Sequence, residues 1–149
     1  MRRASAEDSF AASVSEVEAR WYDTERWPAW VDGLAGVIAV EGDWPRPWSK
    51  VTWESNPAGR GRVVELVVSY EPGLGQTLEV EDDSVRGRQI VAFRELEGGV
   101  AVELALEYEL KQPSILTPLV DALFIRRAMR ASLRATLARF GAELAAARA

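Results

Sequence analysis

The stretch VAVELALEYEL, from Val100 to Leu110, places an apolar residue at every second position, with glutamates or alanines between them. A period of two puts successive side chains on opposite faces of a β-strand. The stretch therefore predicts a strand with one face in the core and the other in water. The residues expected on the core face are Val102, Leu104, Leu106, Tyr108 and Leu110.

A long amphipathic helix is expected after this strand, over residues 118–146. Thr117 can cap it and Pro118 can occupy its first turn. Spacings of three and four then define an apolar stripe made of Leu116, Leu119, Leu123, Met129, Leu133, Leu137, Phe140 and Leu144. Arg126 fills the one gap in the stripe, either with its stem along apolar surface and its charge in water or as a ligand contact.

Upstream, five more segments have a period of two and are separated by turn signals such as PGLG and EGG. These segments cover residues 34–42, 50–55, 62–71, 76–82 and 86–96. The residues expected on their apolar faces include Val64, Leu66, Val68, Tyr70, Leu78 and Val80. A sheet that is apolar on one side and acidic on the other needs a cover on one face only. We expect the long helix to be that cover.

Three tryptophans and a tyrosine gather in WYDTERWPAWV, from Trp21 to Val31. A buried indole usually finds a partner for its N–H, so this cluster marks a core anchor or the wall of an apolar pocket. Just before it, Ser13 or Ser15 can cap a short helix that ends near Asp23. A second short helical turn is expected in ERWPAWV, where Pro28 is tolerated only near the start of the turn.

The composition sets the remaining limits. The chain of 149 residues fits one domain, 1–149, and it has neither cysteine nor histidine. Disulfides, thiolate chemistry, histidine–metal sites and serine–histidine pairs are therefore excluded. The net charge of −5 argues against nucleic-acid binding. No run approaches the roughly 20 apolar residues of a membrane span, and the first residues do not resemble a signal peptide, so a cytoplasmic protein is expected.

The segment SVSEVEARWYDTERWPAWV resembles the signature of the START-like (SRPBCC) superfamily, in particular its polyketide cyclase/dehydrase branch. The matching features are a short helix, then Asp23, then the Trp-Pro-x-Trp turn of Trp27 and Trp30. ELEGGVAVELALEYEL resembles the penultimate hairpin of that branch, and LVDALFIRRAMRASLRATLARF resembles its closing helix. The resemblance implies an α+β helix-grip fold, in which a curved antiparallel sheet of about seven strands wraps around the C-terminal helix and two short helices lie near the N-terminus.

The helix-grip fold leaves a cavity, because one helix does not fill the concavity of a strongly curved sheet. The residues expected to face it are Trp30, Val64, Leu66, Val68, Tyr70, Leu78, Val80, Gln89, Leu104, Leu106, Tyr108, Leu119, Leu123, Arg126 and Met129. Tyr70 and Tyr108 would supply hydroxyl groups, and Gln89 an amide. Because the glutamates alternate outward, no pair of carboxyl groups is expected inside.

The mouth of that cavity is expected between the helix and the loops SNPAGRG, EDDSVRG and LKQPSILTP. Four arginines lie in or directly after two of these loops, namely Arg60, Arg62, Arg86 and Arg88. The arginines either bind a carboxylate or phosphate group of a ligand or form solvated pairs with Asp82 and Asp83.

The function that these features favour is binding of a small hydrophobic molecule, such as a lipid, an isoprenoid or a polyketide-like compound, with no cofactor and no metal. The alternative is a polyketide aromatase/cyclase or dehydratase in which Tyr70, Tyr108 and a mouth arginine act as acid and oxyanion donors. A second alternative is an interaction module whose cavity is filled by side chains. The sequence is also compatible with a homodimer.

Overall fold

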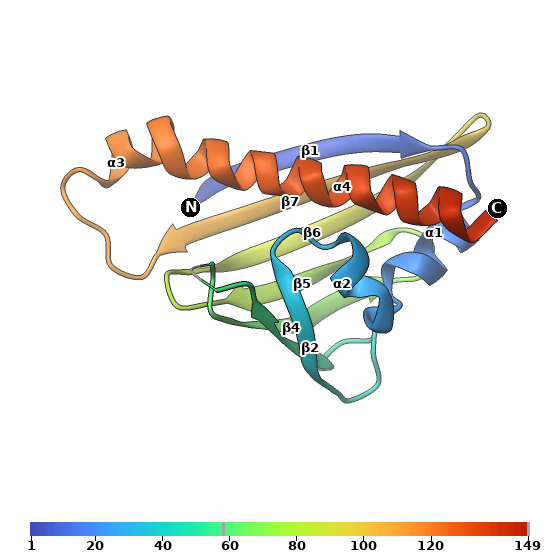
Figure 1. Ribbon diagram of the computed structural model, residues 1–149, viewed down its shortest axis with the longest axis horizontal. Helices are drawn as coiled ribbons and strands as arrows, with labels where there is room; N and C mark the ends of the chain where they lie inside the picture. The colour runs from blue at the N-terminus through green and yellow to red at the C-terminus, as the bar shows by residue number, and fades with distance from the viewer. Residues whose placement is uncertain (58, 149) are drawn as a thin grey trace.

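Seven antiparallel strands form one curved sheet, and a long C-terminal helix lies across one face of it (Figure 1). The computed structural model describes residues 1–57 and 59–148. The strand order is β1-β7-β6-β5-β4-β3-β2. The strands are β1 (Arg2–Phe10), β2 (Leu34–Glu41), β3 (Lys50–Ser55), β4 (Arg62–Glu71), β5 (Gly75–Glu81), β6 (Val85–Leu96) and β7 (Gly99–Leu110). This arrangement confirms the predicted helix-grip fold.

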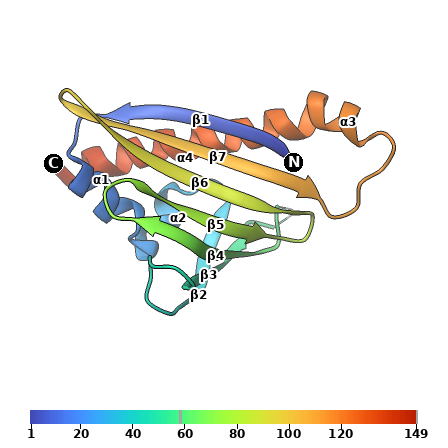
Figure 2. The same cartoon turned by 180° about the vertical axis from the view of Figure 1, so that it is seen from behind.

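The helices all lie on one side of the sheet, as the view from behind also shows (Figure 2). They are α1 (Val14–Trp21), α2 (Trp27–Trp30), α3 (Thr117–Val120) and α4 (Arg126–Arg148). A turn of π-helix, Asp121–Ile125, joins α3 to α4, so the C-terminal helical segment is continuous. None of the helices in the described part of the chain is long and apolar enough to cross a membrane.

The predicted cap is found at the start of α1 but not at the start of α3. Ser13 caps α1, because its Oγ accepts a hydrogen bond from the Glu16 N–H at 3.1 Å while the Glu16 carboxylate accepts from the Ser13 N–H at 3.2 Å. The expectation that Thr117 caps the C-terminal helix is wrong. Thr117 is the first residue of α3, and its hydroxyl accepts a hydrogen bond from the Ser114 N–H.

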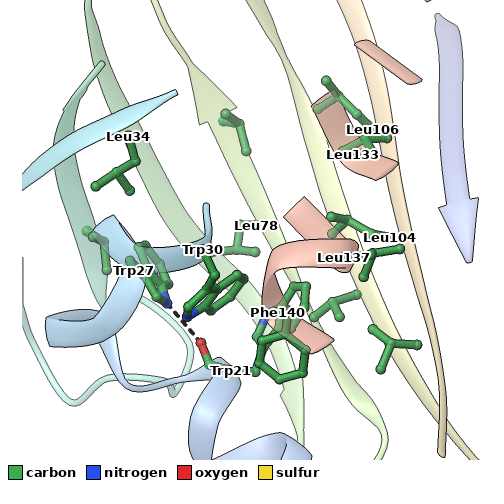
Figure 3. Packing of buried hydrophobic residues seen from close by; sticks show 14 of the residues in the cluster. Trp21, Trp27, Trp30, Leu34, Leu78, Leu104, Leu106, Leu133, Leu137 and Phe140 are labelled. Atoms are coloured by element: carbon green, nitrogen blue, oxygen red, sulfur yellow. Dashed lines mark hydrogen bonds between the residues drawn. The ribbon is translucent and has the colours of Figure 1, made fainter. Parts of the chain in front are cut away.

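The early tryptophans form a core anchor between the short helices and α4 (Figure 3). The ring centroids of Trp21, Trp30 and Phe140 lie 4.8 to 5.0 Å apart at steep angles, which is a favourable geometry for aromatic pairs. The Trp27 indole N–H donates a hydrogen bond of 2.9 Å to the Trp21 carbonyl oxygen. We call this group, with Trp27, the tryptophan end of the concave face.

In strand β4, the face that packs on the core is not the predicted one. Val64 and Leu66 lie on the outer face of the sheet, and the prediction that they point inward is wrong. The inward residues are Val63, Glu65 and Val67. The set that contains Val64 and Leu66 is the more apolar one, and the inward set includes the charged Glu65, so the alternation alone points to the wrong face.

Pairing with the neighbouring strands decides which face of β4 is buried. Glu65 lies opposite Val51 of β3 and Val80 of β5, and both of these valines are buried. Directly opposite residues on neighbouring strands share a face of the sheet. Glu65 is therefore on the same face as the core and α4.

A β-bulge changes the alternation near the end of β4. The register shifts between Val67 and Ser69, so Val68 is an extra, half-buried residue rather than an inward one. Beyond the bulge, Tyr70 lies opposite Gln76, which is buried. Tyr70 thus shares the inner face, as predicted, while the expectation for Val68 is wrong.

Candidate functional site

An open cavity of about 350 Å³ lies between the sheet and the N-terminal half of α4. This volume falls within the range of small-molecule pockets, roughly 300 to 1,000 Å³. We call this region the mouth end. Its lining comes from the β3–β4 loop, the β5–β6 turn, α4 and the inner face of the sheet, and comprises Asp32, Gly33, Ser55, Asn56, Gly59, Arg60, Asp82, Ser84, Val85, Gln89, Leu106, Ala128, Met129, Ser132 and Leu133.

A smaller cavity of about 60 Å³ lies next to it, toward the tryptophan end. The two share five lining residues, namely Asp32, Arg60, Gln89, Ser132 and Leu133. The smaller cavity is lined in addition by Trp21, Trp27, Trp30, Val31, Trp53, Glu65, Leu104 and Thr136. The indole N–H of Trp30 is buried there without a hydrogen-bond partner among the described residues.

Glu65 is the buried carboxyl group of this smaller cavity, with only 5% of its surface exposed. Its Oε2 accepts a hydrogen bond of 3.1 Å from the Trp53 indole N–H. Within the part of the chain that the structure describes, no donor reaches its Oε1. Burial raises the pKa of the Glu65 carboxyl, although the charge of Arg60 and the Trp53 hydrogen bond oppose this shift. A carboxyl group in this setting can act as a hydrogen-bond donor or as a general acid and base.

Arg60 is held at the mouth by two contacts. Its Nε donates a hydrogen bond of 2.7 Å to Asp82 Oδ2, and its guanidinium carbon lies 5.3 Å from the centroid of the Trp53 ring. Asp82 is buried and also accepts hydrogen bonds of 2.9 Å from the backbone N–H groups of Ser84 and Val85. Arg60 thus pairs with Asp82, as in one of the predicted alternatives, but Asp82 is buried and the pair is not fully solvated.

The other predicted mouth arginines do not line the cavity. Arg86 pairs with Glu109 at 2.8 Å, and Arg62 lies 4.0 Å from Glu54. Arg86 and Arg88 border a shallow depression on the outer face of the sheet, together with Val64 and Leu66. Of the four, Arg60 alone reaches the cavity as the structure describes it.

Tyr108 and Arg126 belong to a separate buried polar cluster, so the prediction that they face the cavity is wrong. The Tyr108 hydroxyl donates to Asp121 Oδ1, and Arg126 Nη2 donates to Asp121 Oδ2 at 2.9 Å. Both Tyr108 and Asp121 are fully buried. Burial, together with the hydrogen bond to Asp121, raises the pKa of Tyr108 to about 12. This cluster anchors the π-helical turn to β7.

The same turn corrects the predicted positions of Leu119 and Leu123, which are exposed rather than inward. A π-helical turn contains an extra residue, so it rotates the helix before it relative to the helix after it. Thr117 and Asp121 consequently face inward in place of the leucines. The gap that Arg126 left in the predicted stripe lies directly after this turn.

The remaining predicted residues divide into two groups. Those that line the two cavities are Trp30, Gln89, Leu104, Leu106 and Met129. Leu78 and Val80 are buried on the inner face but outside the lining of these cavities. Tyr70 also lies outside it and packs edge-on against Tyr22, at a ring distance of 5.6 Å.

The chain is similar to known proteins both in sequence and in fold. The family described as polyketide cyclase / dehydrase and lipid transport matches residues 1–145. The chain belongs to this family.

Solved structures related to this polyketide cyclase/dehydrase family member share its fold at low identity. TTHA0849 from Thermus thermophilus is 20% identical, covers 99% of this chain and 100% of its own, and has a TM-score of 0.78. Norcoclaurine synthase from Thalictrum flavum, a point mutant in complex with a transition-state analogue, is 10% identical, with coverages of 99% and 96% and a TM-score of 0.71. At such identities the likeness shows the fold alone. No curated protein matches the sequence significantly.

Sequence reasoning found Gln89 and Arg60 but missed other polar residues of this family member's two cavities, above all Glu65, which it placed in water. The sequence carried no signal for Glu65, because the register that pairs it with the buried Val80 of β5 is set only in the folded sheet. Asp32, Trp53 and Ser132 likewise carried no signal, because they meet only when a loop, a strand and a helix come together. The described residues contain no group of three or more acidic side chains that could hold a metal ion.

Proposed function

We propose that this protein binds one small, mostly apolar molecule in the cavity between the sheet and α4. The observation that carries the proposal is the open volume of about 350 Å³, with apolar walls from Val85, Leu106, Met129 and Leu133. Apolar walls with a few polar groups are typical of small-molecule sites. Open space at this position supports a ligand-binding protein over an interaction module with a filled interior. The family description, which includes lipid transport, agrees with this choice.

The polar groups of the cavity favour a ligand with one neutral oxygen-containing group at its inner end. Glu65 presents Oε1, and Gln89 an amide, without a hydrogen-bond partner among the described side chains. A neutral hydroxyl or carbonyl group can bind a carboxyl group whose pKa is raised, whereas a ligand carboxylate next to Glu65 would be repelled once Glu65 ionises. Long-chain alcohols, isoprenoids and polyketide-like ketones fit this description.

The test uses two alanines of α4 that are both exposed. Ala128 lines the cavity and Ala131 does not. N-phenyl-1-naphthylamine, a neutral apolar dye, should bind the unmodified protein saturably with one site per chain. Ala128→Phe should weaken the binding of the dye about tenfold or more, since a tenfold loss of affinity corresponds to only about 1.4 kcal/mol. The matched variant Ala131→Phe should bind like the unmodified protein.

Two results would contradict this proposal. One is the absence of saturable dye binding to the unmodified protein. The other is equal affinity in Ala128→Phe and Ala131→Phe, which would place the dye elsewhere. Native mass spectrometry of protein purified from its own host would then identify any carried molecule by mass.

Glu65 favours a second candidate function, that of a polyketide cyclase or dehydratase. In a dehydration, a carboxylate removes a proton from the carbon next to a carbonyl group, and a carboxylic acid protonates the departing hydroxyl, which leaves as water. Glu65 has the burial and the raised pKa that suit both steps. Tyr70 and Tyr108, which the sequence suggested for this role, lie outside both cavities and are not needed.

A β-hydroxyacyl thioester of N-acetylcysteamine tests the enzymatic candidate. The unmodified protein should convert it to the α,β-unsaturated thioester with release of water, and Glu65→Gln should lose this conversion while it still binds the naphthylamine dye. Conversion that survives in Glu65→Gln would remove Glu65 from the reaction. No conversion by the unmodified protein would drop this candidate and leave the ligand-binding proposal standing.

A further inference from the structure

An exposed apolar patch lies on the helical segment that precedes α4 and on the turn before it. It consists of Ile115, Leu116, Leu119, Leu123 and Phe124, and Ile115 is 94% exposed while Phe124 is 66% exposed. Single exposed apolar residues are normal on protein surfaces, but a contiguous group marks a site of contact with a partner or a membrane. We refer to these five residues as the apolar patch.

The fold holds the apolar patch outward. Asp121 is fully buried and receives hydrogen bonds from Tyr108 and Arg126, so the rotation of this helical segment is set by a buried polar cluster. To turn Leu119 and Leu123 inward, the helix would have to bring the Asp121 carboxylate to the surface and leave the Tyr108 hydroxyl buried without a partner. Burying an unpaired polar group is costly. The exposure of the patch is therefore a property of the folded chain.

Unpaired arginines continue along the helix directly after the apolar patch. Arg127, Arg130 and Arg134 are exposed, and none of them forms an ion pair with a described residue. From Lys111 to Arg134 the chain carries five basic residues and one acidic residue, a net charge of +4, whereas the whole chain has a net charge of −5. The charge of the molecule is thus strongly polarised toward this segment.

We propose that the apolar patch and the three arginines dock on the surface of an anionic lipid bilayer. An apolar face with a basic flank is the arrangement by which helices bind in the headgroup region of membranes. Each arginine near an anionic surface adds to the attraction. A symmetric contact between two copies of this chain would use the same surface on both and would bring its positive charges together, which is unfavourable. A bilayer with negative headgroups satisfies both the apolar and the charged part of the surface.

The docking surface lies at the same end of the molecule as the cavity mouth (Figure 1). The loop before α3 is tied to the β5–β6 turn by a hydrogen bond of 2.9 Å from the Lys111 N–H to the Ser84 carbonyl oxygen. Ser84 lines the cavity. Docking would therefore bring the mouth of the cavity close to the bilayer. The docking proposal itself does not depend on any ligand in the cavity.

Vesicle co-sedimentation tests this proposal with a matched pair of leucines. Leu119 in the apolar patch and Leu74 in the β4–β5 turn are each 59% exposed. The unmodified protein should sediment with vesicles of phosphatidylcholine and phosphatidylglycerol, and far less with phosphatidylcholine alone. Leu119→Glu should reduce binding about tenfold or more, while Leu74→Glu should leave it unchanged. The double variant Arg127→Ala/Arg130→Ala, which keeps the apolar patch, should also lose about tenfold and should remove most of the salt dependence.

Several outcomes would overturn it. These are no binding to either vesicle, equal binding to both, or an equal loss in Leu74→Glu. A dimer in solution that Leu119→Glu dissociates, without any vesicle binding, would assign the patch to a second copy instead. Circular dichroism checks that each variant is folded, and if Leu119→Glu does not fold, the arginine double variant alone decides the result.

Discussion

The two ends of the concave face differ in how they are filled, although the same sheet and the same helix form both. At the tryptophan end, Trp21, Trp30 and Phe140 pack with ring centroids about 5 Å apart, and only the cavity of about 60 Å³ remains beside them. At the mouth end, a cavity of about 350 Å³ stays open. The short helices α1 and α2 supply large aromatic side chains to the first end only (Figure 3).

The difference shows that the cavity stays open where the helical layer has no large aromatic side chains. Toward the mouth, only α4 covers the sheet, and it presents Ala128, Met129 and Ser132 to the cavity. Short or flexible side chains there do not reach across to the concave face. The polar group Glu65 lies where the packed region meets the open one, next to Trp30.

The largest effect is expected from removal of an aromatic anchor at the tryptophan end. Trp27→Ala should lower the free energy of unfolding by about 3–5 kcal/mol, because it leaves a cavity in a region that is otherwise packed. Trp48→Ala is the control, since Trp48 is 73% exposed and should cost little. Chemical denaturation of both variants measures the difference. Equal midpoints for the two would mean that Trp27 is not an anchor.

A smaller loss is expected at the polar cluster beneath the π-helical turn. Tyr108→Phe removes a donor from the buried carboxylate of Asp121 and should cost about 1–3 kcal/mol, less than Trp27→Ala. Tyr70→Phe is the matched control, because Tyr70 makes no hydrogen bond with a described residue. Denaturation curves that shift equally for the two tyrosines would show that the Tyr108 hydroxyl does not stabilise the turn.

Glu65 should make stability depend on pH in a defined direction. Because its pKa is raised in the folded state, folding takes up a proton, and the stabilisation is fully present below the unfolded pKa of about 4.3 and is lost as pH rises through the folded pKa. Glu65→Gln should flatten this fall. Glu79→Gln, at an exposed position on the outer face, should keep it. Free energies of unfolding measured across this pH range test the direction of the effect. If the free energy of unfolding instead rises with pH, and only Glu65→Gln abolishes the rise, the pKa of Glu65 is lowered by folding and the prediction is wrong.

The smallest effect is expected at the mouth. Met129 is half-buried and borders open space, so Met129→Ala should cost about 1 kcal/mol, mainly through lost transfer energy. Leu137→Ala, in the packed part of the same helix, should cost about 2–5 kcal/mol. Thermal unfolding of the pair measures the contrast. If Met129→Ala costs as much as Leu137→Ala, the mouth end is packed in solution.

The sequence by itself determined the fold class and the order of elements. Local periods of two and of three to four, with Pro and Gly in the turns, predicted the strands and the long helix, because such periods decide which elements can bury an apolar face. A serine cap at Ser13 or Ser15 and the Trp-Pro-x-Trp turn were likewise readable, since their residues are close in the chain, and the structure selects Ser13.

Only the tertiary structure decided the two features on which the catalytic and docking proposals rest. In β4, the alternation favoured the more apolar set of Val64 and Leu66, but pairing with Val51 and Val80 turned Glu65 inward. In the C-terminal segment, an ideal helical period placed Leu119 and Leu123 in the core, but a π-helical turn anchored by buried Asp121 rotated them into solvent. In both cases the local pattern favoured the more apolar face, and contacts with residues distant in sequence selected the other one.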